Sequence, residues 1–354
     1  KLIYSAAAEQ GTNAIATCSV LNEVERLSGF PQWVTDTAAA LNAEQRERNV
    51  LIFDGMMDIF EYDKSWRSFE ELIESLESKK PEWMANRVLT GCTRSRHGAY
   101  EDDPSLAMPT ENELLEDEEL YAEHMRRLHA KKEDKDLNFH IKIYKLLKSP
   151  RQLKALVVKH MREMWDQYLA AEWKRRQAEV KAAVAAFKNL ELDELSPKEA
   201  IRAVLGRDLM KHQDDDFFVG VEQIAFVPSP HVGPYALVLR SGSVVKLIFG
   251  AQHAERFQGE SNALSRSELL NRLSALSDPT RMQILELLME QGEMNSQQVI
   301  AELDLSQSSA SRHLIQLCAS GFLVEKRVAN SKYYAINRDR IDDTIELLSQ
   351  HFDS

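Results

Sequence analysis

The sequence predicts a mainly helical α+β protein: an N-terminal helical domain with a small antiparallel sheet, followed by a C-terminal unit of short helices and a hairpin. Three observations predict this class. Apolar residues recur at helical spacing through most of residues 13–205. Runs rich in β-branched and aromatic residues occupy residues 217–250. Residues 295–337 then combine two helix-start signals with a strand–turn–strand pattern.

Composition narrows the classes of function. The chain has 354 residues, enough for two or three domains, and 44% of them are hydrophobic. Its formal net charge of −12 argues against indiscriminate binding to nucleic acid. No run of about 18 apolar residues occurs and no signal-peptide pattern opens the chain, so we expect a cytoplasmic protein without a membrane partner. Cys18, Cys92 and Cys318 lie far apart and are expected to be free thiols.

The N-terminal domain is expected to be a succession of helices. Ser196 followed by Pro197 predicts the start of one of these helices, because proline is favoured at the first position of a helix. The predicted elements are a strand at residues 2–4, helices at 13–27, from 37 to 51 and beyond, at 69–76 and at 196–205, a polar loop at 91–109, and an almost continuous helical stretch at 111–187 with breaks near 134–136 and 149–150.

A small sheet is predicted where the sequence changes from helical periodicity to runs of β-branched and aromatic residues. Three runs of β-branched and aromatic residues are separated by segments rich in proline, glycine and serine. Gly242 lies between two serines and is suited to a tight hairpin turn, which indicates antiparallel pairing. The strand at residues 2–4 is expected to join this sheet. The candidate strands are residues 217–227, 236–240 and 244–249.

A polar segment at residues 258–265, which contains Gly259, is the expected domain boundary. It separates an N-terminal domain at residues 1–258 from a C-terminal domain at residues 259–354. The first is a possible effector or dimerisation domain, and a small-molecule effector is one reading of its role.

Residues 295–319 show the signals of two helices joined by a short turn. Asn295 can cap the first helix, and Gln298 stands where a capping box places its reciprocal partner. The stretch 304–306 breaks the helical period, and Ser306 is a good N-cap for the second helix. The apolar residues of the second helix recur at helical spacing and should face the core: Ala310, Leu314 and Leu317.

A two-stranded hairpin follows the second helix. Gly321 ends that helix, residues 322–328 form a strand, and residues 332–336 return after a turn at 329–331. This order of elements is that of a winged helix-turn-helix domain. Basic residues flank the tip of the hairpin, where a wing would contact the sugar-phosphate backbone.

The polar residues of the second helix favour DNA as its partner. A helix that enters the major groove uses its N-terminal turns. Gln can read adenine, Arg can read guanine or hold a phosphate, and Ser suits either. The free N–H groups at a helix N-terminus also attract phosphate. For His313, partial burial with a hydrogen-bond partner is an equally good reading. The candidate DNA contacts are Ser306, Gln307, Ser308, Ser309, Ser311, Arg312, His313, Lys326, Arg327 and Lys332.

At these residues the chain resembles the arsenical-resistance-repressor (ArsR) type of winged helix-turn-helix transcriptional regulator. The resemblance covers about residues 265–352, roughly a quarter of the chain, and implies a homodimer that binds a palindromic operator in double-stranded DNA. It also implies that the helix at 307–319 is the reader. The segments that carry it are Leu276-Ser-Asp-Pro-Thr-Arg281, Leu305-Ser-Gln-Ser-Ser-Ala-Ser-Arg-His-Leu314, Gly321-Phe-Leu-Val324 and Tyr333-Tyr334.

The chain departs from the metal-sensing members of that family. Those members bind metals through Cys pairs in the first helix of the motif, or through Asp/His pairs in the last helix. No Cys occurs between Gly292 and Leu303. The last helix offers acidic residues and a histidine without the usual spacing, so a metal sensor of the familiar kind is not expected: Asp342, Asp343, Glu346 and His351.

Two apolar stripes flank the motif. One comes before it and one after it, and packing within a local core can explain part of both. The resemblance favours their use as the surface through which two copies associate. The stripes are Leu269, Leu270, Leu273 and Leu276, and Ile341, Ile345, Leu348 and Phe352.

Other features of the sequence bear on three alternatives: a protein-interaction module, an enzyme and a metal site. The acidic balance and the long helices at residues 111–187 also suit a protein-interaction module, in which the winged helix docks a partner chain. There is no Gly-rich phosphate loop, G-x-S-x-G elbow or H-E-x-x-H motif, so neither an enzyme nor a cofactor is expected. Histidines near other histidines or acids lack the spacing of a metal site: His124 and His129, His160 and Glu163, and His212 with Asp214, Asp215 and Asp216.

Overall fold

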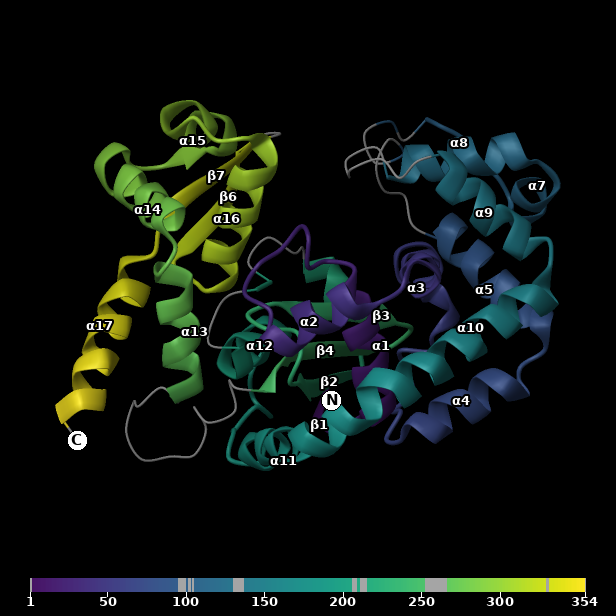
Figure 1. Cartoon of the computed structure of the whole chain (residues 1–354), viewed down its shortest axis with the longest axis horizontal. Helices are drawn as coiled ribbons and strands as arrows, with labels where there is room; N and C mark the ends of the chain where they lie inside the picture. Colours follow the sequence, from purple (N-terminus) through teal and green to yellow (C-terminus); the bar gives the residue numbers. More distant parts are fainter. Residues whose placement is uncertain are drawn as a thin grey trace.

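The chain folds as two mainly helical regions, each of which contains a small sheet (Figure 1). A computed structural model describes residues 2–94, 100, 103, 105–129, 137–205, 209–210, 215–251, 266–328 and 331–353. The mainly helical α+β class predicted from the sequence is confirmed. The predicted domain boundary at 258–265 lies outside the described residues. Within the described ranges, no helix is both long enough and apolar enough to cross a membrane.

The N-terminal region is a bundle of helices, most of which share one apolar core, whereas the helices at Ala170–Phe187 and Pro197–Leu205 pack in two separate clusters. Cys18, Ile52, Leu72 and Val157, from four different helices, are all fully buried in the shared core. The helices are α1 (Gln10–Leu21), α2 (Gln32–Ala40), α3 (Ala43–Gly55), α4 (Phe69–Ser78), α5 (Pro81–Arg94), α7 (Glu111–Glu116), α8 (Glu118–Leu128), α9 (Leu137–Leu147), α10 (Pro150–Met164), α11 (Ala170–Phe187) and α12 (Pro197–Leu205), with short 3-10 turns at Met57–Ile59 and Asp215–Phe218 and a π-helical turn at Trp165–Leu169.

Several predicted boundaries were wrong for identifiable reasons. The helix predicted from residue 37 to 51 and beyond is two helices, because Asn42 caps α3: its side chain accepts from the backbone N–H of Gln45 at 2.8 Å. The loop predicted at 91–109 is wrong at its start, since α5 continues to Arg94, and residues 95–99, 101, 102 and 104 lie outside the described residues. Gly91 sits inside α5 because a Cβ at that position would overlap the carboxylate of Asp58.

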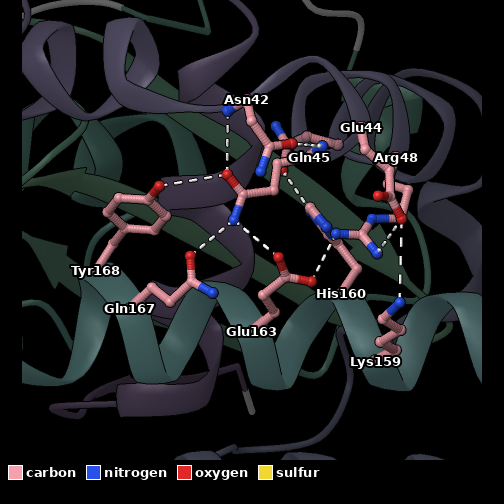
Figure 2. Close-up of polar contacts among 10 residues, drawn as sticks. Asn42, Glu44, Gln45, Arg48, Lys159, His160, Glu163, Gln167 and Tyr168 are labelled. Carbon is pink, nitrogen blue, oxygen red and sulfur yellow. Dashed lines mark hydrogen bonds and ion pairs between the residues drawn. The ribbon is translucent and has the colours of Figure 1, made fainter.

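A polar seam joins α3 to α10 and the π-helical turn, and it is drawn in Figure 2. The side-chain amide of Gln45 donates to Glu163 Oε1 at 2.9 Å and to Gln167 Oε1 at 2.8 Å. Its Oε1 accepts from the backbone N–H of Asn42 at 3.1 Å and from the Tyr168 hydroxyl at 3.3 Å. All four hydrogen-bonding positions of this amide are used, so the seam fixes one register between the two helices.

His160 lies fully buried beside this seam. Its Nε2 is 3.0 Å from Asn49 Oδ1, and the amide nitrogen of Asn49 donates to the carbonyl of Cys18 at 2.7 Å. Asn49 Oδ1 is therefore an acceptor, and Nε2 of His160 carries the proton. Burial, with the nearby charge of Arg48 second, lowers the pKa of His160 to about 4.

The N-terminal sheet was predicted to be antiparallel, and this prediction was wrong for two of its three strand pairs. Its order is β1-β2-β4-β3, and β1 joins it as expected. Only β3 and β4 are antiparallel, whereas β1 pairs with β2 and β2 with β4 in parallel. The loop after β2 leaves the position next to β2 empty, so β3 forms the edge of the sheet. Strand β4 then fills the position between β2 and β3. The strands are β1 (Ile3–Ala6), β2 (Gln223–Ser229), β3 (Ala236–Ser241) and β4 (Val244–Gly250).

The C-terminal region has the predicted winged helix-turn-helix order. Val299, Leu314, Leu317 and Phe322 are fully buried at its centre. Helices α13 and α17 lie side by side at its edge (Figure 1). The elements are α13 (Arg266–Leu276), α14 (Pro279–Gln291), β5 (Met294–Asn295), α15 (Ser296–Leu303), α16 (Gln307–Ala319), β6 (Leu323–Val328), β7 (Ser331–Ile336) and α17 (Arg338–Asp353), with an antiparallel sheet of order β5-β7-β6.

Replacing His160 by glutamine should flatten the acid side of the stability profile. The folded pKa of His160 is lowered from 6.5 to about 4, so the unfolded chain takes up the proton first as the pH falls. Stability present above pH 6.5 is therefore lost toward pH 4, by as much as about 3 kcal/mol. Glutamine can donate to Asn49 without titrating. Denaturant titrations of both proteins from pH 7 to pH 4 measure the difference, and parallel stability curves would contradict the assignment.

Candidate nucleic-acid interface

The starts of α15 and α16 are capped by the residues that the sequence suggested. The side chain of Asn295 accepts from the Gln298 N–H at 3.0 Å, and the Gln298 side chain accepts in return from the Asn295 N–H at 2.8 Å. Asp304 ends α15 in the left-handed region, at φ 50°. Ser306 Oγ then accepts from the Ser309 N–H at 3.1 Å and caps α16. The left-handed residue Asp304 and the cap at Ser306 set the point at which α16 begins after the turn.

Helix α16 divides into a buried face and an exposed N-terminal end. Ala310, Leu314 and Leu317 have no exposed surface, because they pack into the core of the winged unit. Most of the candidate DNA contacts near the N-terminus are solvent-exposed, and Ser309 is half-buried. The exposed group consists of Ser306, Gln307, Ser308, Ser311 and Arg312.

The exposed end of α16 is chemically available to a ligand. Within the part of the chain that the structure describes, the guanidinium of Arg312 forms no ion pair. The hydroxyls of Ser306 and Ser308 are 3.2 Å apart. The first turn of a helix also presents N–H groups without intrahelical partners. The arrangement can accept an anion or hydrogen-bond to the edge of a base.

His313 faces the protein rather than the exposed end of its helix. Its side chain is half-buried, and Nδ1 is 3.7 Å from Asp278 Oδ1 at the start of α14. Burial is the largest cause of a lowered pKa for His313, opposed by the carboxylate of Asp278. The structure thus places His313 as a partly buried side chain near an acid, as one alternative expected, but within the described residues its Nδ1 has no hydrogen-bond partner.

The wing carries its lysines in ion pairs. Lys326 Nζ is 2.8 Å from Glu293 Oε2, and Lys332 Nζ is 3.0 Å from a carboxylate oxygen of Glu325. Both pairs are exposed, so each contributes little to stability. The turn predicted at 329–331 falls mainly outside the described residues, as does the side chain of Arg327. Sequence reasoning missed the two carboxylates, although Glu325 is only one residue from Lys326.

A buried guanidinium behind α16 was also missed. Arg281 Nε donates to the carbonyl of Ala275, and Nη2 donates to the carbonyl of Ser274 at 2.8 Å, both at the end of α13. Nη1 donates to Gln316 Oε1 of α16 at 2.8 Å. One side chain therefore joins α13, α14 and α16. The sequence signalled only a helix start here, and Asp278 does cap α14 through the Arg281 N–H at 3.0 Å.

The two apolar stripes divide between core and surface. Leu269 is buried, and Ile341 is partly buried against the core. Leu270 on α13 is 56% exposed, and Ile345 and Phe352 on α17 are 60% and 78% exposed. These three exposed side chains lie on α13 and α17, which are neighbouring helices at the edge of the winged unit.

The chain is similar to known regulators over this region. The sequence model of the family described as "Bacterial regulatory protein, arsR family" matches residues 278–325. An uncharacterized HTH-type transcriptional regulator of Methanocaldococcus jannaschii is 36% identical over 76 residues, which are 22% of this chain and 85% of that protein. The arsenical resistance operon repressor of Staphylococcus aureus is 30% identical over 86 residues, 24% of this chain and 82% of that protein.

Loss of the cap at Ser306 should weaken the winged unit. Ser306→Ala removes the acceptor for the Ser309 N–H, and a lost N-cap costs about 1 kcal/mol. Denaturant unfolding followed by circular dichroism measures the change. Ser311→Ala is the matched control, because Ser311 is exposed within the same helix and caps nothing; its stability should equal or exceed that of wild type. Equal stabilities of Ser306→Ala and wild type would exclude the cap.

Proposed function

This chain belongs to the arsR family of bacterial regulatory proteins, and from that premise we propose that it binds palindromic double-stranded DNA as a homodimer with α16 as the reading helix. It is a DNA-binding transcriptional regulator. The exposed polar N-terminal end of α16 is the observation that carries the proposal. Its helix has an apolar face held in the core, so the polar end can enter a groove without exposing apolar surface.

Within this proposal the residues of α16 have separate roles. Gln307 and Arg312 contact base edges, since their side chains can make paired hydrogen bonds to adenine and to guanine. Ser308 and Ser311 contact bases or phosphates, and Ser306 and Ser309 help to hold a phosphate at the helix N-terminus. His313 supports the helix from behind. Lys326, Arg327 and Lys332 approach phosphates, and the two lysines exchange their carboxylate partners for them.

The exposed edge of α13 and α17 supports the dimer. Leu270, Ile345 and Phe352 lie in water in the single chain, and burying them against the same residues of a second copy removes apolar surface from water. A two-fold axis there would place two reading helices on half-sites about one helical turn, roughly 34 Å, apart. The remaining N-terminal domain is proposed as the effector-responsive part. A coupling of about 1–3 kcal/mol would suffice to shift DNA affinity by tenfold or more.

The alternative is that the winged unit docks a partner protein. The ion pairs of Lys326 and Lys332 favour it, because they neutralise the charges a wing would offer to phosphate. Duplexes selected by the purified protein from a random-sequence pool at low salt discriminate between the two. Enrichment of a palindrome supports the DNA reading, and failure to retain any duplex supports the partner reading.

Removing the proposed base readers should relax sequence preference. Gln307→Ala and Arg312→Ala should each reduce the discrimination between the selected duplex and a scrambled one by about 1–3 kcal/mol, because a paired hydrogen bond to one base is lost. Competition binding measures the ratio of dissociation constants. Arg202→Ala on α12 is the control for loss of one exposed positive charge, and its ratio should be unchanged. If both α16 variants kept the wild-type ratio, these residues would not be the readers.

A charge on the α17 edge should dissociate the dimer. Ile345→Glu places a carboxylate in the proposed apolar interface, so sedimentation equilibrium should show monomers where wild type is dimeric. Affinity for the selected duplex should fall with it, since one chain spans one half-site. Met289→Glu on α14 is the control, because Met289 is also exposed, at 50%, but is carried by neither α13 nor α17. A dimeric Ile345→Glu protein would place the interface elsewhere.

A further inference from the structure

The N-terminal domain contacts the reading helix at one buried polar side chain. Gln316 lies toward the C-terminal end of α16 and is only 2% exposed. Its Oε1 accepts from Arg281 Nη1 at 2.8 Å, and the hydroxyl of Ser28, in the segment between α1 and α2, donates to the same oxygen. Gly29 packs so closely that a Cβ there would lie 2.9 Å from Gln316 Nε2.

The Ser28 segment is itself held firmly in the N-terminal domain. The Tyr235 hydroxyl donates to the carbonyl of Ser28 at 2.5 Å, and the ring of Tyr235 packs against Phe30 with centroids 5.1 Å apart. Gly233 adopts φ +60°, and a Cβ there would meet the carbonyl oxygen of Gly29 at 2.7 Å. The loop before β3 and the segment after α1 therefore interlock, and Phe30 joins the main helical core. These contacts anchor the Ser28 segment to that core.

On the other side, Gln316 is tied to the elements that bind DNA and form the proposed dimer. Arg281 bonds Gln316 and also the carbonyls of Ser274 and Ala275, which end α13. Helix α13 bears Leu270 on the exposed edge. A series of hydrogen bonds thus connects the N-terminal domain, through Ser28, Gln316 and Arg281, to both α16 and α13.

We propose that Gln316 is a positioning residue through which the docked N-terminal domain holds α16 in its DNA-binding orientation. The contact lies near the C-terminal end of α16 and leaves Gln307, Ser308, Ser311 and Arg312 exposed, so the docked arrangement is compatible with DNA. A ligand or partner that pulls the Ser28 segment away from Gln316 releases α16 and lowers affinity. This inference rests on the proposed function and adds the route by which the N-terminal domain controls it.

Two glycine variants separate this contact from general backbone strain. Gly29→Leu introduces a side chain against Gln316 at φ +91°, and Gly220→Leu introduces the same side chain at φ +76° with nothing within 4 Å. Both variants carry left-handed strain, but only the first separates the domains. Gly29→Leu should bind the selected duplex at least about fivefold more weakly than wild type, within the usual range of coupling between sites, whereas Gly220→Leu should match wild type.

A double-mutant cycle tests whether the effect passes through Gln316. In a Gln316→Ala background, Gly29→Leu should weaken binding no further, because the contact is already lost. The salt dependence of binding should keep its slope in every variant, since no phosphate contact is removed. Ser28→Ala should weaken binding in the same direction as Gly29→Leu, and Ser28→Thr, which keeps the hydroxyl, should restore it.

The outcomes distinguish this inference from the function on which it rests. Wild-type protein that retains no duplex at low salt overturns the proposed function itself. Wild-type protein that binds the selected duplex, with folded and dimeric Gly29→Leu binding it equally well, overturns the role of Gln316 alone. Should Gly29→Leu fail to fold, the Ser28→Ala and Ser28→Thr pair decides: equal affinity of both for the duplex overturns the inference, and weaker binding by Ser28→Ala alone supports it.

Discussion

Helix α16 must be held by a core along one face while its N-terminal end remains in water, and the rest of the winged unit follows from that constraint. Ala310, Leu314 and Leu317 supply the buried face. Ser306 ends the preceding turn and caps the helix by accepting from the Ser309 N–H, so the polar end begins at a defined residue and its remaining first-turn N–H groups face outward. The apolar contacts hold the helix in place, and the cap determines where its exposed end begins.

Buried polar contacts give the apolar cores their geometry. Apolar packing tolerates small shifts between helices, but a side chain with several directional hydrogen bonds fits only one arrangement. Gln45 serves this role between α3 and α10, where four hydrogen bonds converge on its amide. Gln316 and Arg281 have the same role behind α16. In both places the polar group lies between helices whose relative position matters to the rest of the fold.

The winged unit could be predicted because its signals span only a few residues. Contacts between residues far apart in the sequence could not be predicted. Asn295 with Gln298, and Ser306, are signals read over three residues, and the structure has both. The parallel pairing of β2 with β4 was missed because it depends on where the connecting loop runs. Gln316 was missed because its partner Ser28 is 288 positions away. A polar residue on a helix looks solvated until the element covering it is known.

Hydrogen exchange of the backbone amides, measured with and without the selected duplex, tests the central claim most directly. If the exposed end of α16 enters the groove, exchange should slow at residues 306–312 and in the strands of the wing, while α4 and α10 in the N-terminal domain keep their rates. A duplex that slows exchange only outside the winged unit, with residues 306–312 unchanged, would contradict the assignment of α16 as the reading helix.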